Sequence, residues 1–131
     1  MKIKINSLDA IIFDFDGVLT DNKVYVFQDG KEAVKCNRAD GLGFDILREN
    51  KLPVFILSTE KNEVVKFRAE KLGVPAIHGV DNKGETLKKL VDEYKFSLNK
   101  IMFVGNDLND ISAMEIVNYP VAVADAHSEI K

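Results

Sequence analysis

Residues 10–21, AIIFDFDGVLTD, decide the fold of this chain because they join an apolar run directly to acidic residues. The first four residues of the stretch form an uninterrupted apolar run, typical of a strand that is covered on both faces. Asp14 and Asp16 follow two positions apart, so an extended backbone places both carboxylates on one side. Gly17 then fits a chain reversal that bulky residues do not tolerate. The stretch predicts a buried strand of a parallel sheet that ends in an acidic loop.

Apolar runs of strand length recur along the chain, and amphipathic stretches separate them. Further strands are predicted at 54–57, 76–78, 101–104 and 121–123. Apolar residues at helical spacing predict helices with one buried face around 65–72 and 87–94. Because strands and helices alternate, and 131 residues suit one compact domain, the sequence predicts a single α/β domain, 1–131, with a parallel sheet.

One segment interrupts this alternation directly after the first strand. Residues 24–27 and 32–36 are rich in β-branched, aromatic and apolar side chains, and Asp29-Gly30 between them is a preferred pair for a tight turn. The segment is therefore predicted to be a β-hairpin. Three roles are open for it: a flap over the mouth of the sheet, a surface for another subunit, or a plain surface excursion.

The composition excludes several classes of partner. The chain has 18 basic and 21 acidic residues, mixed along its length, so no basic stripe marks a nucleic-acid or anionic membrane surface. Its apolar runs are strand-sized, far below the span of a bilayer. A single cysteine, Cys36, excludes an internal disulfide, and the N-terminal apolar stretch is too short for a signal peptide. We therefore expect a cytoplasmic protein.

Polar residues occur just where the predicted strands stop. The second strand runs into Ser58, Thr59 and Glu60, the fourth into the acidic loop 105–110, and Lys83 opens a helix after the third. In open parallel sheets the ligand crevice lies beyond the carboxyl ends of the strands. These groups are therefore expected to converge with the acidic loop of the first strand on one rim.

This set of groups suits phosphoryl transfer. Paired carboxylates repel each other unless a cation lies between them, and Mg²⁺ prefers a few carboxylates, water and a substrate phosphate. Asp14 is the predicted nucleophile, and Asp16 would protonate the leaving alcohol and later activate water. Lys83 would neutralise the phosphoryl oxygens, Ser58 would donate a hydrogen bond to one of them, and Asp107 would help to complete the metal site.

The string at 13–21 resembles the DxDGxxTD signature of the haloacid dehalogenase superfamily, and Ser58, Lys83 and the acidic loop 105–110 follow in that family's order. The resemblance covers essentially the whole chain. It implies a three-layer Rossmann-like fold with a β-hairpin flap after the first strand. The absence of an inserted cap domain resembles the capless branch that contains 3-deoxy-octulosonate 8-phosphate phosphatases. In that branch the hairpin helps to build a homotetramer.

A finer resemblance concerns the substrate. Residues 57–62, LSTEKN, together with Gly105-Asn106-Asp107, look closest to phosphatase-like domains of N-acylneuraminate cytidylyltransferases and to nonulosonate 9-phosphate phosphatases. The octulosonate enzymes usually have Gly-Arg where this chain has Thr59-Glu60. The resemblance thus favours an acidic nine-carbon sugar phosphate over an eight-carbon one, and Thr59, Glu60 and Arg68 are the expected substrate contacts.

The chain departs from the family pattern at the metal site. The fourth motif usually begins Gly-Asp, whereas the matching position here is Asn106. An amide oxygen can bind Mg²⁺ but has no formal charge. The metal ligands implied by the resemblance are therefore Asp14, Asp16, Asn106 and Asp107.

Two other functions compete with a phosphatase. A phosphoryl-receiver domain also combines acidic residues, Mg²⁺ and a lysine, but it has its acceptor aspartate after a middle strand. A catalytically weak oligomerisation domain, related to the cytidylyltransferases, is favoured by Asn106. Against it stand four intact residues that share no structural purpose: Asp14, Asp16, Ser58 and Lys83.

Overall fold

The computed structural model describes residues 4–130, and its centre is a five-stranded parallel sheet. The strand order is β5-β4-β1-β6-β7, so the first strand in sequence lies in the middle. The bounds are β1 (Ala10–Phe13), β4 (Val54–Leu57), β5 (Ala76–Ile77), β6 (Ile101–Gly105) and β7 (Tyr119–Ala122). This arrangement confirms the predicted α/β class.

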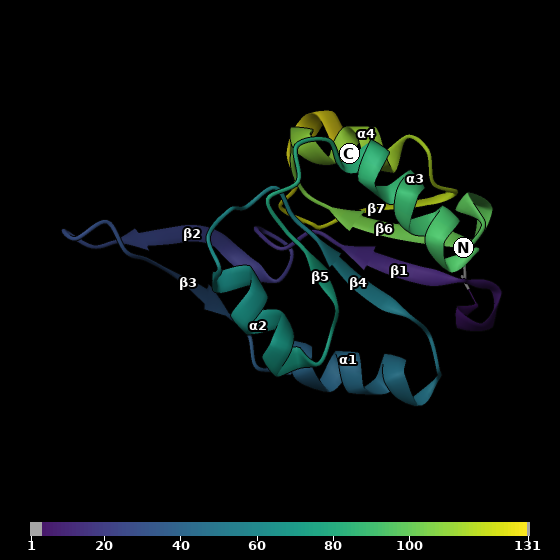
Figure 1. Ribbon diagram of the computed structural model, residues 1–131, viewed down its shortest axis with the longest axis horizontal. Helices are drawn as coiled ribbons and strands as arrows, with labels where there is room; N and C mark the ends of the chain where they lie inside the picture. The colour runs from purple at the N-terminus through teal and green to yellow at the C-terminus, as the bar shows by residue number, and fades with distance from the viewer. Residues whose placement is uncertain (1–3, 131) are drawn as a thin grey trace.

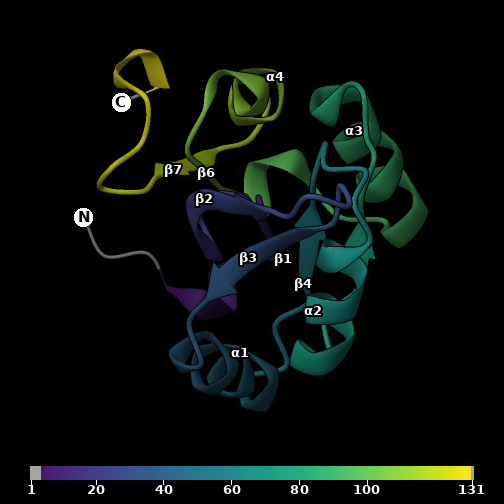
Figure 2. The same cartoon turned by 90° about the vertical axis from the view of Figure 1, so that its left-hand side faces the viewer.

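Helices cover both faces of the sheet. Figures 1 and 2 place α1 (Ala39–Glu49) and α2 (Val64–Leu72) on one side, and α3 (Lys83–Tyr94) and α4 (Ile111–Met114) on the other. Short 3₁₀ turns complete the described chain at Ile5–Ser7, Leu98–Lys100, Leu108–Asp110 and Ser128–Ile130. The predicted three-layer fold is confirmed, and residues 4–130 contain no inserted cap domain.

Two apolar cores hold the layers together, one on each face. Neighbouring residues of β1 contribute to different cores: Ile12 packs with Leu87 of α3, and Ile11 with Phe44 of α1. Both isoleucines are buried, which explains why β1 is apolar throughout instead of alternating. Burial of β1 on both faces fixes the position of the loop that follows it.

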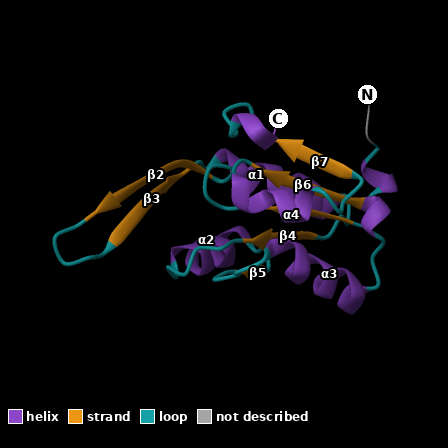
Figure 3. Cartoon of the chain, turned by 90° about the horizontal axis from the view of Figure 1, so that it is seen from above, coloured by secondary structure: helices purple, strands orange, loops and turns teal. Residues whose placement is uncertain are grey.

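The predicted hairpin forms a separate two-stranded sheet, β2 (Thr20–Val26) and β3 (Glu32–Cys36), which pair antiparallel. It projects away from the body of the molecule (Figures 1 and 3). The turn uses Gly30 at φ +86°, a left-handed conformation that glycine adopts without strain. Residues 24–27, which are apolar or aromatic, are exposed on this arm.

Several elements differ from prediction, and the four-residue helix α4 is one that was not predicted. Helix α1 was not predicted either; it contains two glycines, Gly41 and Gly43, and glycine is a poor helix former. The last strand was predicted at 121–123 but occupies Tyr119–Ala122. Pro120 lies within it, and this is tolerated because β7 is an edge strand, where a missing donor leaves no neighbour unpaired.

Across residues 4–130 the helices are too short and too polar to cross a bilayer; α3 has 12 residues.

Candidate active site

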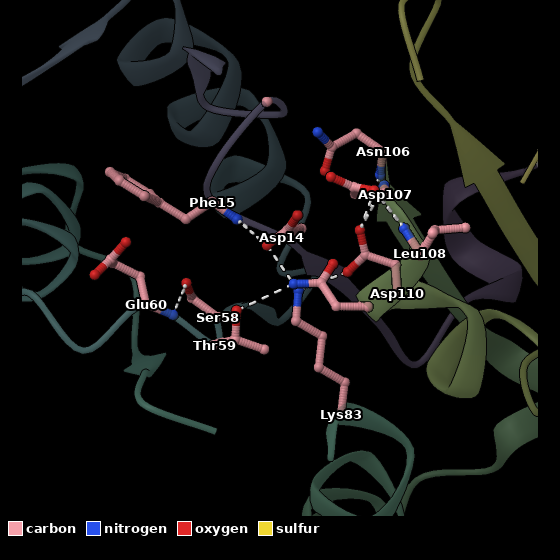
Figure 4. A network of polar contacts seen from close by, with 12 residues as sticks. Asp14, Phe15, Ser58, Thr59, Glu60, Lys83, Asn106, Asp107, Leu108 and Asp110 are labelled. Carbon is pink, nitrogen blue, oxygen red and sulfur yellow. Dashed lines mark hydrogen bonds and ion pairs between the residues drawn. The ribbon is translucent and has the colours of Figure 1, made fainter. Parts of the chain in front are cut away.

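The loops after β1, β4 and β6 meet at one rim of the sheet. Strand β1 pairs with β4 on one side and with β6 on the other, and Phe13 is level with Ile56 and Val104. The residues that follow these strands therefore lie side by side, and the first turn of α3 approaches them (Figure 4). The predicted convergence at the carboxyl ends of the strands is present.

Lys83 is the hub of this rim. Its Nζ donates to Asp14 Oδ1 at 2.7 Å and to Asp110 Oδ1 at 2.6 Å (Figure 4). Lys83 is only 1% exposed and Asp14 4%. Lys83 is the first residue of α3, which is fixed in place by Asn82, whose side chain accepts a hydrogen bond from Glu85 N. One buried ammonium thus serves two buried carboxylates.

Asp14 is held from the backbone as well. Its amide donates to Val104 O at 2.9 Å, and its Oδ1 accepts from Phe15 N at 2.7 Å. Oδ1 therefore accepts both the backbone and the lysine hydrogen bond, while Oδ2 takes part in neither. The carboxylate is fixed in orientation, with one oxygen uncommitted to these two donors.

Asp110 was not among the predicted site residues. It is fully buried, and its Oδ2 accepts from the backbone amides of Asn106 at 2.9 Å and Asp107 at 3.2 Å. Gly105 permits this packing, since a Cβ there would lie 2.8 Å from the Asp110 carboxyl. Asp110 thus shapes the loop and orients Lys83. Its spacing three residues after Asp107, where the structure has a capping box, was the available sequence signal.

Burial changes the acidity of both aspartates of the first loop. Burial raises the pKa of Asp14 to about 7; Lys83 opposes this rise and the charge of Asp110 adds to it. The pKa of Asp16 is also raised, first by burial and then by the negative charge of Glu60. A raised pKa lets Asp16 hold a proton nearer to neutral pH, which suits a proton donor.

A small polar cavity of about 40 Å³ lies between the three loops. The residues around it are Asp14, Asp16, Asn22, Thr59, Asn106, Asp107 and Asn109. Gly17, at φ +82°, comes so close to the Asn106 amide that a Cβ would collide with it. The first loop and the acidic loop are therefore packed directly against each other at this cavity.

Asn106 is suited to a hard cation. It is 6% exposed, and its Oδ1 is buried without a hydrogen-bond partner in the described chain. A buried oxygen without a donor is costly unless a ligand satisfies it. Within residues 4–130, no three His, Cys, Asp or Glu side chains gather closely enough to hold a metal ion. The carboxylates of Asp14, Asp16 and Asp107 around the cavity do not form such a group by themselves. A cation there would therefore also need the Asn106 amide oxygen, water and a phosphate, a ligand set that fits Mg²⁺.

Ser58 and Glu60 extend the site toward the hairpin. Ser58 is buried, and its Oγ accepts from Glu60 N at 3.0 Å, which leaves the hydroxyl hydrogen free to donate elsewhere. Glu60 and Asp16 line a neighbouring cavity of about 170 Å³, together with Lys23 and Glu32 of the hairpin. This second cavity adjoins the proposed reaction centre at Asp16.

Arg68 lies apart from the other predicted site residues. Its Nη2 donates to Asn37 O at 3.0 Å, at the base of the hairpin. Its Nε is buried without a partner among the described residues. Arg68 lines neither of the two cavities at Asp16. In this structure it contacts the hairpin base, whereas Thr59, Glu60 and Asp107 all lie at the cavities.

A family model described as haloacid dehalogenase-like hydrolase matches residues 48–131. The 3-deoxy-D-manno-octulosonate 8-phosphate phosphatase of Escherichia coli K12 is 33% identical over 125 residues, which cover 95% of this chain and 66% of that protein. N-acylneuraminate cytidylyltransferase A of Danio rerio is 27% identical over 95% of this chain and 30% of its own length. The octulosonate phosphatases and the acylneuraminate cytidylyltransferases, two of the three groups named by resemblance, are thus among the relatives. The chain spans about two thirds or less of their length.

A solved structure supports the same assignment. A Streptomyces avermitilis protein of the HAD family of hydrolases superposes with a TM-score of 0.95 at 42% identity. The superposition covers 99% of this chain and 75% of that one. The sheet, its helices and the rim described above therefore belong to a fold shared along nearly the whole chain.

Proposed function

Since the chain belongs to the haloacid dehalogenase-like hydrolases, we propose that it is a Mg²⁺-dependent phosphatase that acts through an aspartyl phosphate at Asp14. The supporting observation is the buried hub, in which Lys83 lies within 2.7 Å of both Asp14 and Asp110. A buried lysine between two carboxylates has a clear purpose if a phosphate dianion is to be bound beside them.

In the first step an Asp14 carboxylate oxygen attacks phosphorus, and the bond from phosphorus to the leaving oxygen breaks. Asp16 gives its proton to that oxygen, and the alcohol departs. In the second step water attacks the phosphorus of the aspartyl phosphate, and Asp16 takes a proton from the water. The bond between phosphorus and the Asp14 oxygen breaks, and inorganic phosphate leaves. Both aspartates return to their starting states.

Two further groups stabilise the charge that develops on the phosphoryl oxygens. Lys83 supplies a positive charge in a buried setting, where electrostatic interactions are stronger than in water. The free hydroxyl hydrogen of Ser58 donates to one of the oxygens. The proposed residues Asp14, Asp16, Asn106 and Asp107 would hold the Mg²⁺ ion. When bound, it reduces the repulsion between carboxylate and phosphate and aligns them.

The proposed substrate is an acidic sugar phosphate, and a nonulosonate 9-phosphate is favoured. The pair Thr59-Glu60 supports this choice over an octulosonate 8-phosphate, which is the alternative suggested by the E. coli relative. Glu60 adjoins Asp16, where the leaving alcohol departs, and Thr59 lines the smaller cavity. Arg68 has an Nε donor without a partner in the part of the chain that the structure describes, and it is proposed as an outer contact for the sugar carboxylate.

A homotetramer is proposed as the working assembly in the cytoplasm, without nucleic-acid or membrane partners. The hairpin supports self-association, because Val24, Tyr25, Val26 and Phe27 are all exposed on an arm that leaves the body of the molecule. Exposed apolar surface of this extent is a mark of an interaction site.

A catalytically weak oligomerisation domain is the second candidate. It is favoured by the neutral Asn106 in the acidic loop and by the similarity to a cytidylyltransferase. The match covers only 30% of the length of that cytidylyltransferase. This candidate keeps the proposed assembly but predicts no turnover.

The test is phosphate release from a panel of sugar phosphates, with Mg²⁺ and with a chelator. We expect Mg²⁺-dependent release by the unchanged protein, none by Asp14→Asn, and full release by Lys88→Met, an exposed change on the same helix as Lys83. The preferred sugar separates nonulosonate from octulosonate. A folded, metal-supplied protein that releases no phosphate from any substrate would support the oligomerisation domain instead.

A further inference from the structure

We propose that Asn109 is a positioning residue: it holds the Thr59 hydroxyl so that this group donates its hydrogen to a phosphoryl oxygen in the cavity. The proposal rests on the phosphatase function proposed above and adds a residue to its machinery. Asn109 itself need not touch the substrate.

The two residues join opposite sides of the site. Thr59 follows β4, and Asn109 lies in the 3₁₀ turn Leu108–Asp110 that follows β6. Strands β4 and β6 flank β1 on its two sides, so a contact between their loops spans the carboxyl end of β1, where Asp14 lies. Asn109 Nδ2 donates to Thr59 Oγ1 at 3.0 Å. Both side chains line the small cavity with Asp14 and Asn106.

The hydrogen bond from Asn109 determines whether the Thr59 hydroxyl acts as a donor or as an acceptor toward the cavity. A threonine hydroxyl has one hydrogen to donate and two lone pairs that accept. Because Asn109 donates to Oγ1, that oxygen already has a donor, and its own hydrogen is left for another acceptor. Ser58, the preceding residue, is arranged in the same way, since its Oγ accepts from Glu60 N at 3.0 Å. Two successive hydroxyls are thus both prepared to donate at the rim.

Two such hydroxyl donors suit a negatively charged acceptor. Carboxylates of Asp14, Asp16 and Asp107 already surround the cavity, so an anion there needs donors on its remaining sides. A phosphoryl group held by Lys83 would receive them from the hydroxyls of Ser58 and Thr59. Fixing Thr59 before the substrate arrives removes the entropic cost of orienting it later.

The experiment compares kcat and KM for the best sugar phosphate of the panel in Asn109→Ala, Asn109→Asp, Thr59→Ala, Thr59→Ser and the double alanine variant. We expect Asn109→Ala and Thr59→Ala each to lower kcat/KM about tenfold, and the double variant to lose no more than Thr59→Ala alone. Thr59→Ser should stay within about threefold of the unchanged protein, because it keeps the hydroxyl.

The Asn109→Asp variant tests the proposal most directly. The carboxylate that replaces the amide only accepts, so it would draw the Thr59 hydrogen away from the cavity and should cost more than Asn109→Ala. Asn99→Ala, an exposed change outside the site, is the control, and melting temperatures check that every variant is folded. Independent, multiplying losses in the double variant, or equal activity of Asn109→Asp and the unchanged protein, would overturn the proposal.

A binding measurement separates this proposal from the proposed function. Inorganic phosphate is titrated in the presence of Mg²⁺ into the unchanged protein and the same variants. If no sugar phosphate is hydrolysed, the phosphatase proposal fails, yet Asn109→Ala and Thr59→Ala should still weaken phosphate binding by the same non-additive factor. Undiminished phosphate binding by both variants would refute the role of Asn109 whatever the activity.

Discussion

Lys83 is nearly inaccessible to solvent and pairs with two carboxylates, so its removal has a large predicted cost. In Lys83→Met the side chain keeps its shape, but Asp14 and Asp110 are left buried without their cation. We expect a loss of about 3–5 kcal/mol in the free energy of unfolding at pH 8, measured by denaturant titration. Lys88→Met, on the exposed side of α3, should change it by less than about 0.5 kcal/mol. Equal stability of the two variants would contradict the role of the hub.

The raised pKa of Asp14 predicts that the stability of the metal-free protein depends on pH. Its pKa is about 7 in the folded chain and close to the ordinary 3.8 when unfolded, so the folded state holds the proton more tightly. Between these values the folded state binds more protons, and its stability therefore falls as the pH rises. We expect the free energy of unfolding of the unchanged protein, relative to Asp14→Asn, to decrease from pH 4 to about pH 7. A difference that grows over this window would show that burial does not dominate at Asp14.

For individual residues, the sequence predicted which side chains lie together at the rim but not which of them form hydrogen bonds with each other. Asp14, Ser58 and the acidic loop were predicted together because each follows an apolar strand, and parallel strands end at one rim. The bond from Lys83 to Asp110 joins residues 27 apart in sequence, and no local pattern encodes it. The position of Arg68 depends on where the hairpin base lies, which its helical spacing could not indicate.

The packing of α3 against α4 depends on one glycine. Gly84 N donates to Ser112 Oγ at 3.0 Å, and a Cβ on Gly84 would lie 2.9 Å from the Ser112 carbonyl oxygen. Because that neighbour is backbone, Gly84→Ala must push the helices apart and shift the adjacent Lys83. We expect it to destabilise the fold by about 1–3 kcal/mol in thermal or denaturant unfolding and to lower phosphatase activity.

Gly43→Ala is the matched control for this change. Gly43 lies inside α1, and a Cβ there would have nothing within 4 Å. Alanine should therefore stabilise the helix by about 0.5–1 kcal/mol. Opposite signs for the two glycines support the α3–α4 contact; a neutral or stabilising Gly84→Ala would refute it.

The helices and strands that were predicted differ from those that were not in how clearly their sequences reflect their position in the fold. Strands β1, β4 and β6 lie inside the sheet and are marked by continuous apolar runs, as the inner position requires. Helix α1 contains Gly41 and Gly43, and because glycine is a poor helix former the sequence gives only a weak helical signal there. The edge strand β7 tolerates Pro120, which a sequence pattern takes as a strand breaker.

The proposed tetramer can be tested by a substitution on the projecting hairpin. Tyr25 is 61% exposed on β2, and Phe67 is 60% exposed on α2, so the two aromatics are matched in exposure. If the hairpin joins the subunits of a tetramer, Tyr25→Asp should dissociate it, because a buried unpaired carboxylate opposes association. Phe67→Asp should leave the mass in solution unchanged. Light scattering after size exclusion makes the measurement, and a monomeric unchanged protein would contradict the proposed assembly.

The central claim is that Asp14 forms a covalent bond to phosphorus, and quenching the protein in acid during turnover tests it most directly. Borohydride reduction followed by peptide mass spectrometry should convert a phosphorylated Asp14 to homoserine, in the peptide that contains residues 10–21 and only when substrate and Mg²⁺ are present. Lys88→Met should give the same product. Turnover that leaves Asp14 unmodified under these conditions would contradict the covalent mechanism and assign the attack on phosphorus to water.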